Sequence, residues 1–423
     1  MESDLLKSRI VFELNEFNVD LLKDATDNRP FLRKLLNMNH VSTKIPDHYS
    51  SDFLEPWSQW VSIHTNKSCK DHNIKHLGDI ELLDIPHIWD ENPSDYGFIW
   101  GCLNSKNPSS EIIAYFPDPW TLSAKTNVRK LSSLEAFLRL AVSDRGDNLL
   151  KRLIYFSKLL IRFVQISPIL LFRIDRAFIK VATKNHRSLF NISSIYSLIE
   201  YLSFNIFLSE IKKAKVSGKI NIFFANMLAH CQHYYWNTNN HGRLILVLDL
   251  IEEMLRKSFE QFEEIVVING LSQEYSADKE EWNSFYPSIG WKKFIKKYIS
   301  DKAEVQPCMS YDAIMSFSSS DDLNKARKKA NSFYVLDDGK HLPLFLIEDY
   351  GDSKNRLFIR FQYYESDTVD VSFDNELFEF KRLFSKLATR TARHIQECDV
   401  YHNLEINKGF EFNWELGPFY SRS

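Results

Sequence analysis

The sequence predicts an α/β protein built on a mainly parallel central sheet with helices on both faces. Apolar, β-rich runs alternate with helix-like segments, beginning with residues 10–14 and 19–24, and this alternation is typical of parallel sheets. The same pattern returns at 220–224 and 264–269. Several of these runs end in polar residues, as strands do where an open α/β sheet forms its ligand crevice.

The first part of the predicted core runs from residue 1 to 122. A strand at 10–14 ends in a polar turn and is followed by a helix at 19–24. A second α/β unit is expected around 57–65. A third contains an apolar strand at 95–100.

Residues 123–218 show long helical periodicity with few strand signals, which predicts a helical insertion or cap. Charged residues interrupt its most apolar part, so it lacks the roughly 18 to 20 apolar residues that a membrane span needs. Two interpretations stay open for 149–180, where basic residues alternate with aromatic and aliphatic ones. The segment either packs its apolar stripe on the core or makes a peripheral contact with a membrane surface.

The second part of the predicted core runs from 219 to 423. Strands are expected at 220–224 and 264–269, and short antiparallel strands at 357–361 and 368–372. Residues 391–394 are expected to follow a helix.

Composition excludes several classes of protein. The 423 residues are 44% hydrophobic and 26% charged, which is ordinary for a globular chain. A net charge of −3 gives no support for a nucleic-acid partner. The five cysteines form no Cys-x-x-Cys pair, and the N-terminus lacks the pattern of a secretion signal. We therefore expect reduced thiols and a cytoplasmic protein, with a membrane-peripheral location if 149–180 binds lipid.

The most informative stretch is 226–236, which follows the expected strand at 220–224. It places His230 and His233 between Asn226 and Trp236. Imidazoles at the end of a strand can bind a metal ion or transfer protons at neutral pH. The alternative is that both histidines merely flank a turn between a strand and a helix.

Five segments share a pattern with one known family, and they are residues 12–16, 55–66, 226–236, 264–273 and 391–399. Together they resemble the alkaline phosphatase superfamily, nearest its nucleotide pyrophosphatase/phosphodiesterase branch. The resemblance covers roughly 8–121 and 219–403 and leaves the helical insertion unmatched. It implies the α/β core and a metal-dependent hydrolase.

The N-terminal part departs from the family pattern at two places. Asn15 stands where the family has a metal-binding Asp, and Pro56 stands at the position of the nucleophilic Thr or Ser. Proline cannot attack a substrate. Glu55 and Ser58 are the neighbours able to act instead, one as a carboxylate and the other as a hydroxyl.

The C-terminal part keeps histidines and loses carboxylates. The family's Asp-x-x-x-His aligns either with 229–233 or with 226–230, so His233 and His230 are alternatives. Asn269 and Gly270 replace an Asp-His pair, while His394 resembles the family's late histidine. Because two close divalent ions need several carboxylates, this inventory favours a single ion, zinc or manganese.

The resemblance and the placement of polar residues imply the following roles. The metal ligands are expected among His230, His233 and His394, completed by Asn15, Glu13 or Glu16. Glu13 and Asn15 are two residues apart on a strand and so share a face. The expected substrate-binding residues are Asn226, Asn269, Ser272, Gln273, Trp60 and Trp236.

Two functions remain open. The first is a hydrolase or transferase that acts on a small-molecule or glycan-linked phosphate or sulfate ester, such as a phosphodiester, with one divalent ion. The second is a catalytically inactive protein, without a required metal, that binds a glycan, a nucleotide-sugar or a protein. The retained histidines favour the first, and Pro56 with Asn269 favours the second. A role in polysaccharide metabolism is a further expectation.

Overall fold

The structure is a computed structural model, and it describes residues 6–46, 54–81, 85–142, 157, 161, 192–215, 217–236, 241–276, 282–307, 311–337, 339–350, 355–406 and 408–422. The chain forms two compact units. The first contains residues 1–135, 161–276 and 391–423, and the second contains 136–160 and 277–390.

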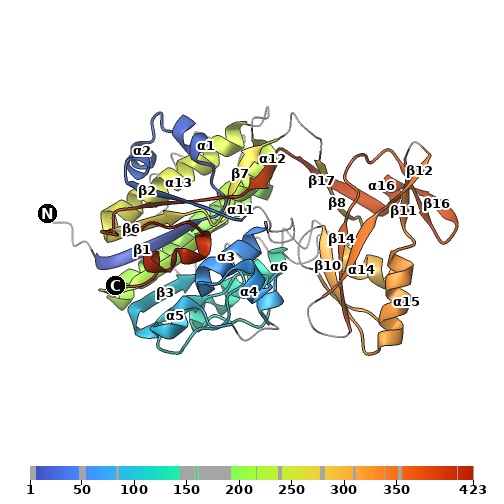
Figure 1. Cartoon of the computed structure of the whole chain (residues 1–423), viewed down its shortest axis with the longest axis horizontal. Helices are drawn as coiled ribbons and strands as arrows, with labels where there is room; N and C mark the ends of the chain where they lie inside the picture. The colour runs from blue at the N-terminus through green and yellow to red at the C-terminus, as the bar shows by residue number, and fades with distance from the viewer. Residues whose placement is uncertain are drawn as a thin grey trace. The chain divides into compact units, whose positions relative to one another are not determined.

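The first unit is built on a seven-stranded sheet with the order β2-β19-β6-β1-β5-β3-β4 (Figure 1). The strands are β1 (Leu6–Leu14), β2 (Asn39–Lys44), β3 (Tyr96–Trp100), β4 (Ala114–Phe116), β5 (Ile220–Ala225), β6 (Phe262–Ile268) and β19 (Glu397–His402). The five strands from β6 to β4 are parallel, and β19 is antiparallel to both of its neighbours. The predicted mainly parallel sheet is therefore confirmed.

Helices surround this sheet on both faces. They are α1 (Val19–Asp24), α2 (Pro30–Leu36), α3 (Pro56–Thr65), α4 (Cys69–His72), α5 (Ile88–Glu91), α11 (Ile192–Ala214), α12 (Met227–Tyr235) and α13 (His241–Gln261). A further helix, α6 (Ser132–Val142), is divided between the two units. Short helical turns are η1 (Asp79–Glu81), η2 (Pro93–Asp95), η3 (Arg129–Leu131), η5 (Asn413–Glu415) and η6 (Gly417–Phe419).

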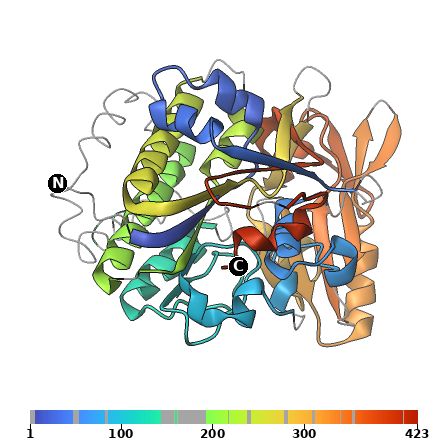
Figure 2. The same cartoon turned by 60° about the vertical axis from the view of Figure 1, so that its left-hand side comes forward.

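Two neighbouring residues of β1 show how the faces are divided. The ring of Phe12 stacks on Phe204 of α11 with 5.8 Å between centroids, whereas the carboxylate of Glu13 bonds His64 of α3. Successive residues of a strand point to opposite sides, so α11 and α3 cover opposite faces (Figure 2). Burial on both faces explains the consecutive apolar residues 10–12 of β1.

Two local predictions need correction. Residues 391–394 were expected to follow a helix, but the element before them is strand β17 (Phe384–Arg390), and Ala392–Ile395 is itself strand β18, which pairs with β7 (Ser272–Tyr275). The segment around 57–65 contains no strand, since helix α3 begins at Pro56 and continues to Thr65. Proline at the first helical position loses no hydrogen bond, because that N–H has no partner within the helix.

The second unit is made mostly of short antiparallel strands. They form sheets β13-β14-β10-β9 and β12-β11-β15-β16 and the pair β17-β8. The strands are β8 (Trp282–Pro287), β9 (Glu304–Pro307), β10 (Asp312–Ser316), β11 (Tyr334–Asp337), β12 (Lys340–Pro343), β13 (Phe345–Asp349), β14 (Arg356–Phe361), β15 (Asp370–Phe373), β16 (Glu376–Glu379) and β17 (Phe384–Arg390). The helices are α14 (Trp291–Phe294), the π-helical turn η4 (Ile295–Ile299), α15 (Ser320–Ala330) and α16 (Phe380–Leu383). Its core is rich in phenylalanine.

The units differ from the predicted domains in two respects. The predicted insertion at 123–218 is not a unit of its own, since 136–160 belong to the second unit and the rest to the first. Residues 277–390 were predicted as part of the core at 219–423, but they form most of the second unit. The short strands predicted near 357–361 and 368–372 are present as β14 and β15. Their pattern shows that they are strands, but it does not show which sheet they join.

Part of the predicted insertion at 123–218 can be placed. Helix α11 lies in this range and packs on the core sheet through Phe204. Residues 149–180 lie outside the described residues except for 157 and 161, so their membrane contact stays a prediction. Among the helices that are described, none has the length and apolar character needed to span a membrane.

Candidate metal centre

The candidate site lies in the first unit, where three neighbouring parallel strands end. Strand β1 is followed by Asn15 and Glu16, β5 by Asn226, and β6 by Asn269. The backbone N–H of Glu16 donates to the carbonyl of Asn269 at 2.9 Å, and that of Asn15 donates to Ala225 at 2.9 Å. The carboxyl ends of such strands form the crevice in which α/β proteins bind ligands.

Glu16, His233 and His394 form the centre of this site. The Nε2 atoms of His233 and His394 lie 3.1 Å and 3.2 Å from Oε2 of Glu16. One donor atom from each residue can be chosen so that all three lie within 4.8 Å of one another. The three side chains come from the turn after β1, from helix α12 and from strand β18.

Glu16 is held in an unusual environment. It is 2% exposed and its backbone adopts a positive φ of 59°. Burial alone would raise the pKa of its carboxyl, but His394 and His233 lower it by charge and hydrogen bonding, so the net shift is well below the ordinary value. The carboxylate therefore stays ionised between the two imidazoles.

Asn15 orients Glu16. Its Nδ2 donates to Oε1 of Glu16 at 2.9 Å and to Oδ1 of Asn226 at 2.8 Å. Its Oδ1 accepts a hydrogen bond from Nε1 of Trp60 at 2.7 Å. Because both ends of the amide are engaged, Asn15 and Trp60 position the carboxylate, and Asn226 supports them.

Two glutamines complete the surroundings of the carboxylate. The side chain of Gln273 donates to Oε2 of Glu16, and its Nε2 lies 3.1 Å from Nε2 of His233. Gln232 donates to the backbone carbonyl of Glu16 at 2.9 Å. Gln273 was predicted as a site residue from its place after β6, whereas Gln232 was not predicted.

His394 also contacts the start of α3. Its Nδ1 lies 3.0 Å from the carbonyl oxygen of Leu54 and 3.5 Å from Oε2 of Glu55. If Nδ1 carries the proton and donates to Leu54, Nε2 presents a lone pair toward Glu16. This is the arrangement that histidine ligands of metal ions commonly have. Glu55 thus borders the centre, with 21% of its side chain exposed.

The structure does not bring every predicted residue to this centre. Ser58 is fully buried, and its hydroxyl donates to the carbonyl of Ile74 at 2.7 Å. Glu13 does share a face with Asn15, but it lies roughly 7 Å further down the strand, where it bonds His64. The ring of His230 lies beside Tyr234 at 5.1 Å and is not part of the cluster. Of the two alignments, 229–233 is therefore the one whose histidine lies in the candidate centre.

Three predicted substrate-binding residues have other contacts. Asn269 accepts from the N–H of Asp399 at 2.8 Å and donates to the carbonyl of Phe17 at 2.9 Å. Ser272 donates to the same carbonyl at 3.1 Å. The ring of Trp236 lies 6.3 Å from that of Tyr275. Asn269 and Ser272 thus hold the turn that follows β1.

The sequence predicts Glu16 as a ligand only as an alternative to Asn15 and Glu13. The signal that could have singled it out is its place directly after Asn15, in the turn that leaves the strand. Side chains within a strand point alternately to the two faces of the sheet, whereas a residue in the following turn can point beyond the end of the strand.

Comparisons with known proteins address the fold. Neither a protein-family model nor a curated protein matches this sequence. Similar solved structures include phosphonoacetate hydrolase from Sinorhizobium meliloti 1021 in complex with phosphonoformate, at 12% identity and a TM-score of 0.38, covering 98% of this chain and 94% of the other. Human ectonucleotide pyrophosphatase/phosphodiesterase 5 is another, at 7% identity and a TM-score of 0.42, covering 97% and 93%.

At such identities and TM-scores, the likeness says nothing about activity. The chemistry of this chain has to come from its own side chains.

Proposed function

We propose that Glu16, His233 and His394 bind one divalent metal ion, zinc or manganese, and that the chain is a hydrolase or transferase acting on phosphate or sulfate esters. The observation that carries this proposal is the convergence of one carboxylate and two imidazole donors within 4.8 Å. Two histidines and one glutamate form the ligand set of several catalytic zinc sites, which leave a further position for water or substrate.

The donor atoms fit a metal ion in three ways. The carboxylate supplies negative charge, and its lowered pKa keeps it ionised. His394 has a backbone carbonyl 3.0 Å from Nδ1, which favours the tautomer that ligates through Nε2. Asn15 and Gln232 hold Glu16 from its side chain and its backbone.

A bound ion would polarise the ester and lower the pKa of a bound water. Glu55, which is partly exposed beside His394, is placed to accept the proton of an attacking water. Pro56 offers no hydroxyl and Ser58 faces a buried carbonyl, so water is the favoured nucleophile. A single carboxylate among the ligands supports one ion rather than two.

The second candidate is a binding protein without catalysis. Asn269 supports it, because both ends of its amide bond the backbone and its side chain brings no carboxylate to the site. A glycan, nucleotide-sugar or protein would then be the ligand. A cytoplasmic location and a role in polysaccharide metabolism remain predictions from the sequence.

The test is the metal content of the purified wild type and of His233→Ala, His394→Ala and His230→Ala. We expect the first two variants each to lose one equivalent of zinc or manganese relative to the wild type. His230→Ala is the matched control on the same helix and should keep the full content. Phosphodiester and sulfate-ester turnover should fall at least about 100-fold in His394→Ala, as expected when the ion that activates water is lost.

Equal metal content in all four proteins would overturn the metal centre. Wild-type protein that binds a nucleotide-sugar unchanged after treatment with a chelator, and that turns over no ester, would support the binding protein instead.

A further inference from the structure

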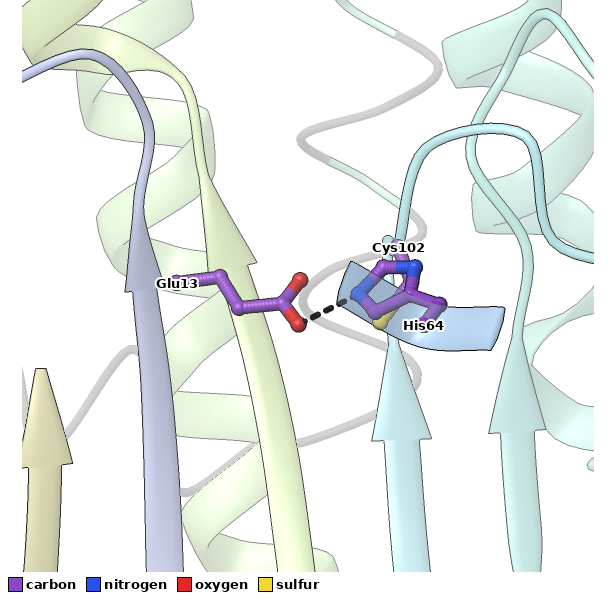
Figure 3. A group of neighbouring side chains, drawn as sticks. All are labelled: Glu13, His64 and Cys102. Carbon is purple, nitrogen blue, oxygen red and sulfur yellow. Dashed lines mark hydrogen bonds and ion pairs between the residues drawn. The ribbon is translucent and has the colours of Figure 1, made fainter. Parts of the chain in front are cut away.

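A second group of potential ligands lies deeper in the first unit and is separate from the centre described above. Glu13 on β1, His64 on α3 and Cys102 after β3 point toward one another (Figure 3). One donor atom from each residue lies within 4.8 Å of the others. All three residues are fully buried.

Two polar atoms of this group form no hydrogen bond with the described residues. Oε1 of Glu13 lies 2.7 Å from Nε2 of His64 and accepts a hydrogen bond from the hydroxyl of Tyr420 at 2.7 Å. Oε2 of Glu13 and Nδ1 of His64 are buried and have no hydrogen-bond partner among the described residues. Buried polar atoms without a partner are uncommon in proteins, and a metal ion bound here would give both atoms a partner.

The surroundings are aromatic. The rings of Trp60, Trp89 and Tyr420 lie 5.7, 5.0 and 5.8 Å from that of His64. In such apolar surroundings a lone charge is strongly disfavoured, whereas a neutral set of opposite charges is tolerated.

We propose that Glu13, His64 and Cys102 bind a structural zinc ion. Thiolate and imidazole are preferred zinc ligands, and glutamate is a common third one. A thiolate and a carboxylate together balance the two positive charges, so the buried complex is neutral. Binding releases the thiol proton of Cys102 to solvent, and the hydroxyl of Tyr420 keeps its hydrogen bond to Glu13.

The ion would connect three segments that are far apart in the sequence. The sulfur of Cys69, by contrast, contacts Ser62 and Gln59. Among the described residues, Cys102 is the cysteine that belongs to a group able to hold a metal ion.

The test uses cobalt as a spectroscopic substitute for zinc. Protein produced in cobalt-supplemented medium should show the near-ultraviolet absorption of a thiolate bound to cobalt. The centre at Glu16 contains no sulfur, so this absorption reports on Cys102 whether or not the proposed function holds. We expect Cys102→Ser to abolish the absorption and to lose one equivalent of metal, while His394→Ala keeps the absorption.

Matched controls are Cys69→Ser, Cys231→Ser, Cys308→Ser and Cys398→Ser, which should all keep the absorption. If Cys102→Ser does not fold, retention of the absorption in these four variants still assigns it to Cys102. Cobalt-loaded wild type without the absorption would overturn the proposal. So would an absorption that persists in folded Cys102→Ser or that disappears in one of the four control variants.

Discussion

At the scale of single residues, Gly270 links the packing of the core to the candidate centre. It has a positive φ of 73°, and a Cβ added there would lie 2.6 Å from Cε2 of Trp60. Trp60 in turn donates to Asn15, which orients Glu16. A side chain at 270 would therefore disturb both the fold and the carboxylate.

We predict that Gly270→Ala lowers the free energy of unfolding by about 3 kcal/mol. Left-handed backbone costs an alanine about 1 kcal/mol, and overpacking adds roughly 1 to 3 kcal/mol. Gly218→Ala is the matched control, because Gly218 also has a φ of 73° but its added Cβ would meet only Nη1 of Arg422 at 3.8 Å. Urea unfolding measures both variants, and equal losses would show that Trp60 does not resist the new side chain.

Single residues also determine which carboxylate near the end of β1 reaches the candidate centre. Glu13, Asn15 and Glu16 lie within four consecutive positions, and the sequence offers all three as candidate ligands. The turn after β1 directs Glu16 to the two histidines, and the pleat directs Glu13 to His64. Glu13 and Glu16, which are three positions apart, thus belong to two different clusters of side chains.

At the scale of elements, helix α12 delivers His233 to the centre and is held at its start by helix α11. Oε2 of Glu200 on α11 accepts hydrogen bonds from the backbone N–H groups of Asn226 and Met227, at 3.0 and 2.7 Å. Burial raises the pKa of Glu200 to about 7, although these two bonds oppose the shift. We therefore expect the start of α12 to respond to pH.

We predict that Glu200→Gln removes a pH-dependent contribution to stability. The folded-state pKa lies above the ordinary value of 4.5, so this contribution is fully present below pH 4.5 and is lost as the pH rises through about 7. Relative to wild type, the variant should gain roughly 2 to 3 kcal/mol between pH 5 and pH 8, since one pKa unit corresponds to about 1.4 kcal/mol.

Urea unfolding of both proteins at the two pH values measures this difference. Glu210→Gln, on the same helix but bonded to Lys213 at 3.0 Å, is the matched control for the loss of a carboxylate. A stability difference between Glu200→Gln and wild type that does not change with pH would contradict the prediction.

At the scale of the whole molecule, the stretch 277–390 leaves and re-enters the first unit at one place. Strands β7 and β18 are antiparallel neighbours, and the N–H of Ser276 donates to the carbonyl of Thr391 at 3.0 Å. The two ends of the stretch are therefore adjacent, as in a hairpin.

We predict that the first unit folds when 277–390 is replaced by an Asn-Gly turn, which suits a two-residue hairpin. Gln273 and His394 are paired across β7 and β18, so the centre should keep its metal. Circular dichroism and metal analysis of the deletion variant measure both properties, with His394→Ala in the same background as the control. An unfolded variant, or a folded one without the metal, would show that the first unit depends on this stretch.

The class of the fold and the edge of the sheet that carries the candidate site follow from the sequence alone. Local alternation of apolar runs predicted β1, β3, β5 and β6, because backbone conformation and burial follow from the pattern of neighbouring residues. Polar residues after these strands predicted the edge of the sheet at which His233, His394 and Gln273 lie.

Which side chains meet becomes clear only from the folded chain. Glu16 and His394 are 378 positions apart, and Glu13 meets His64 and Cys102 from two other elements. The assignment of 277–390 to a second unit likewise depends on which strands pair. A periodic pattern reports the local backbone, whereas contacts between distant residues depend on how the chain packs, and no single segment carries that information.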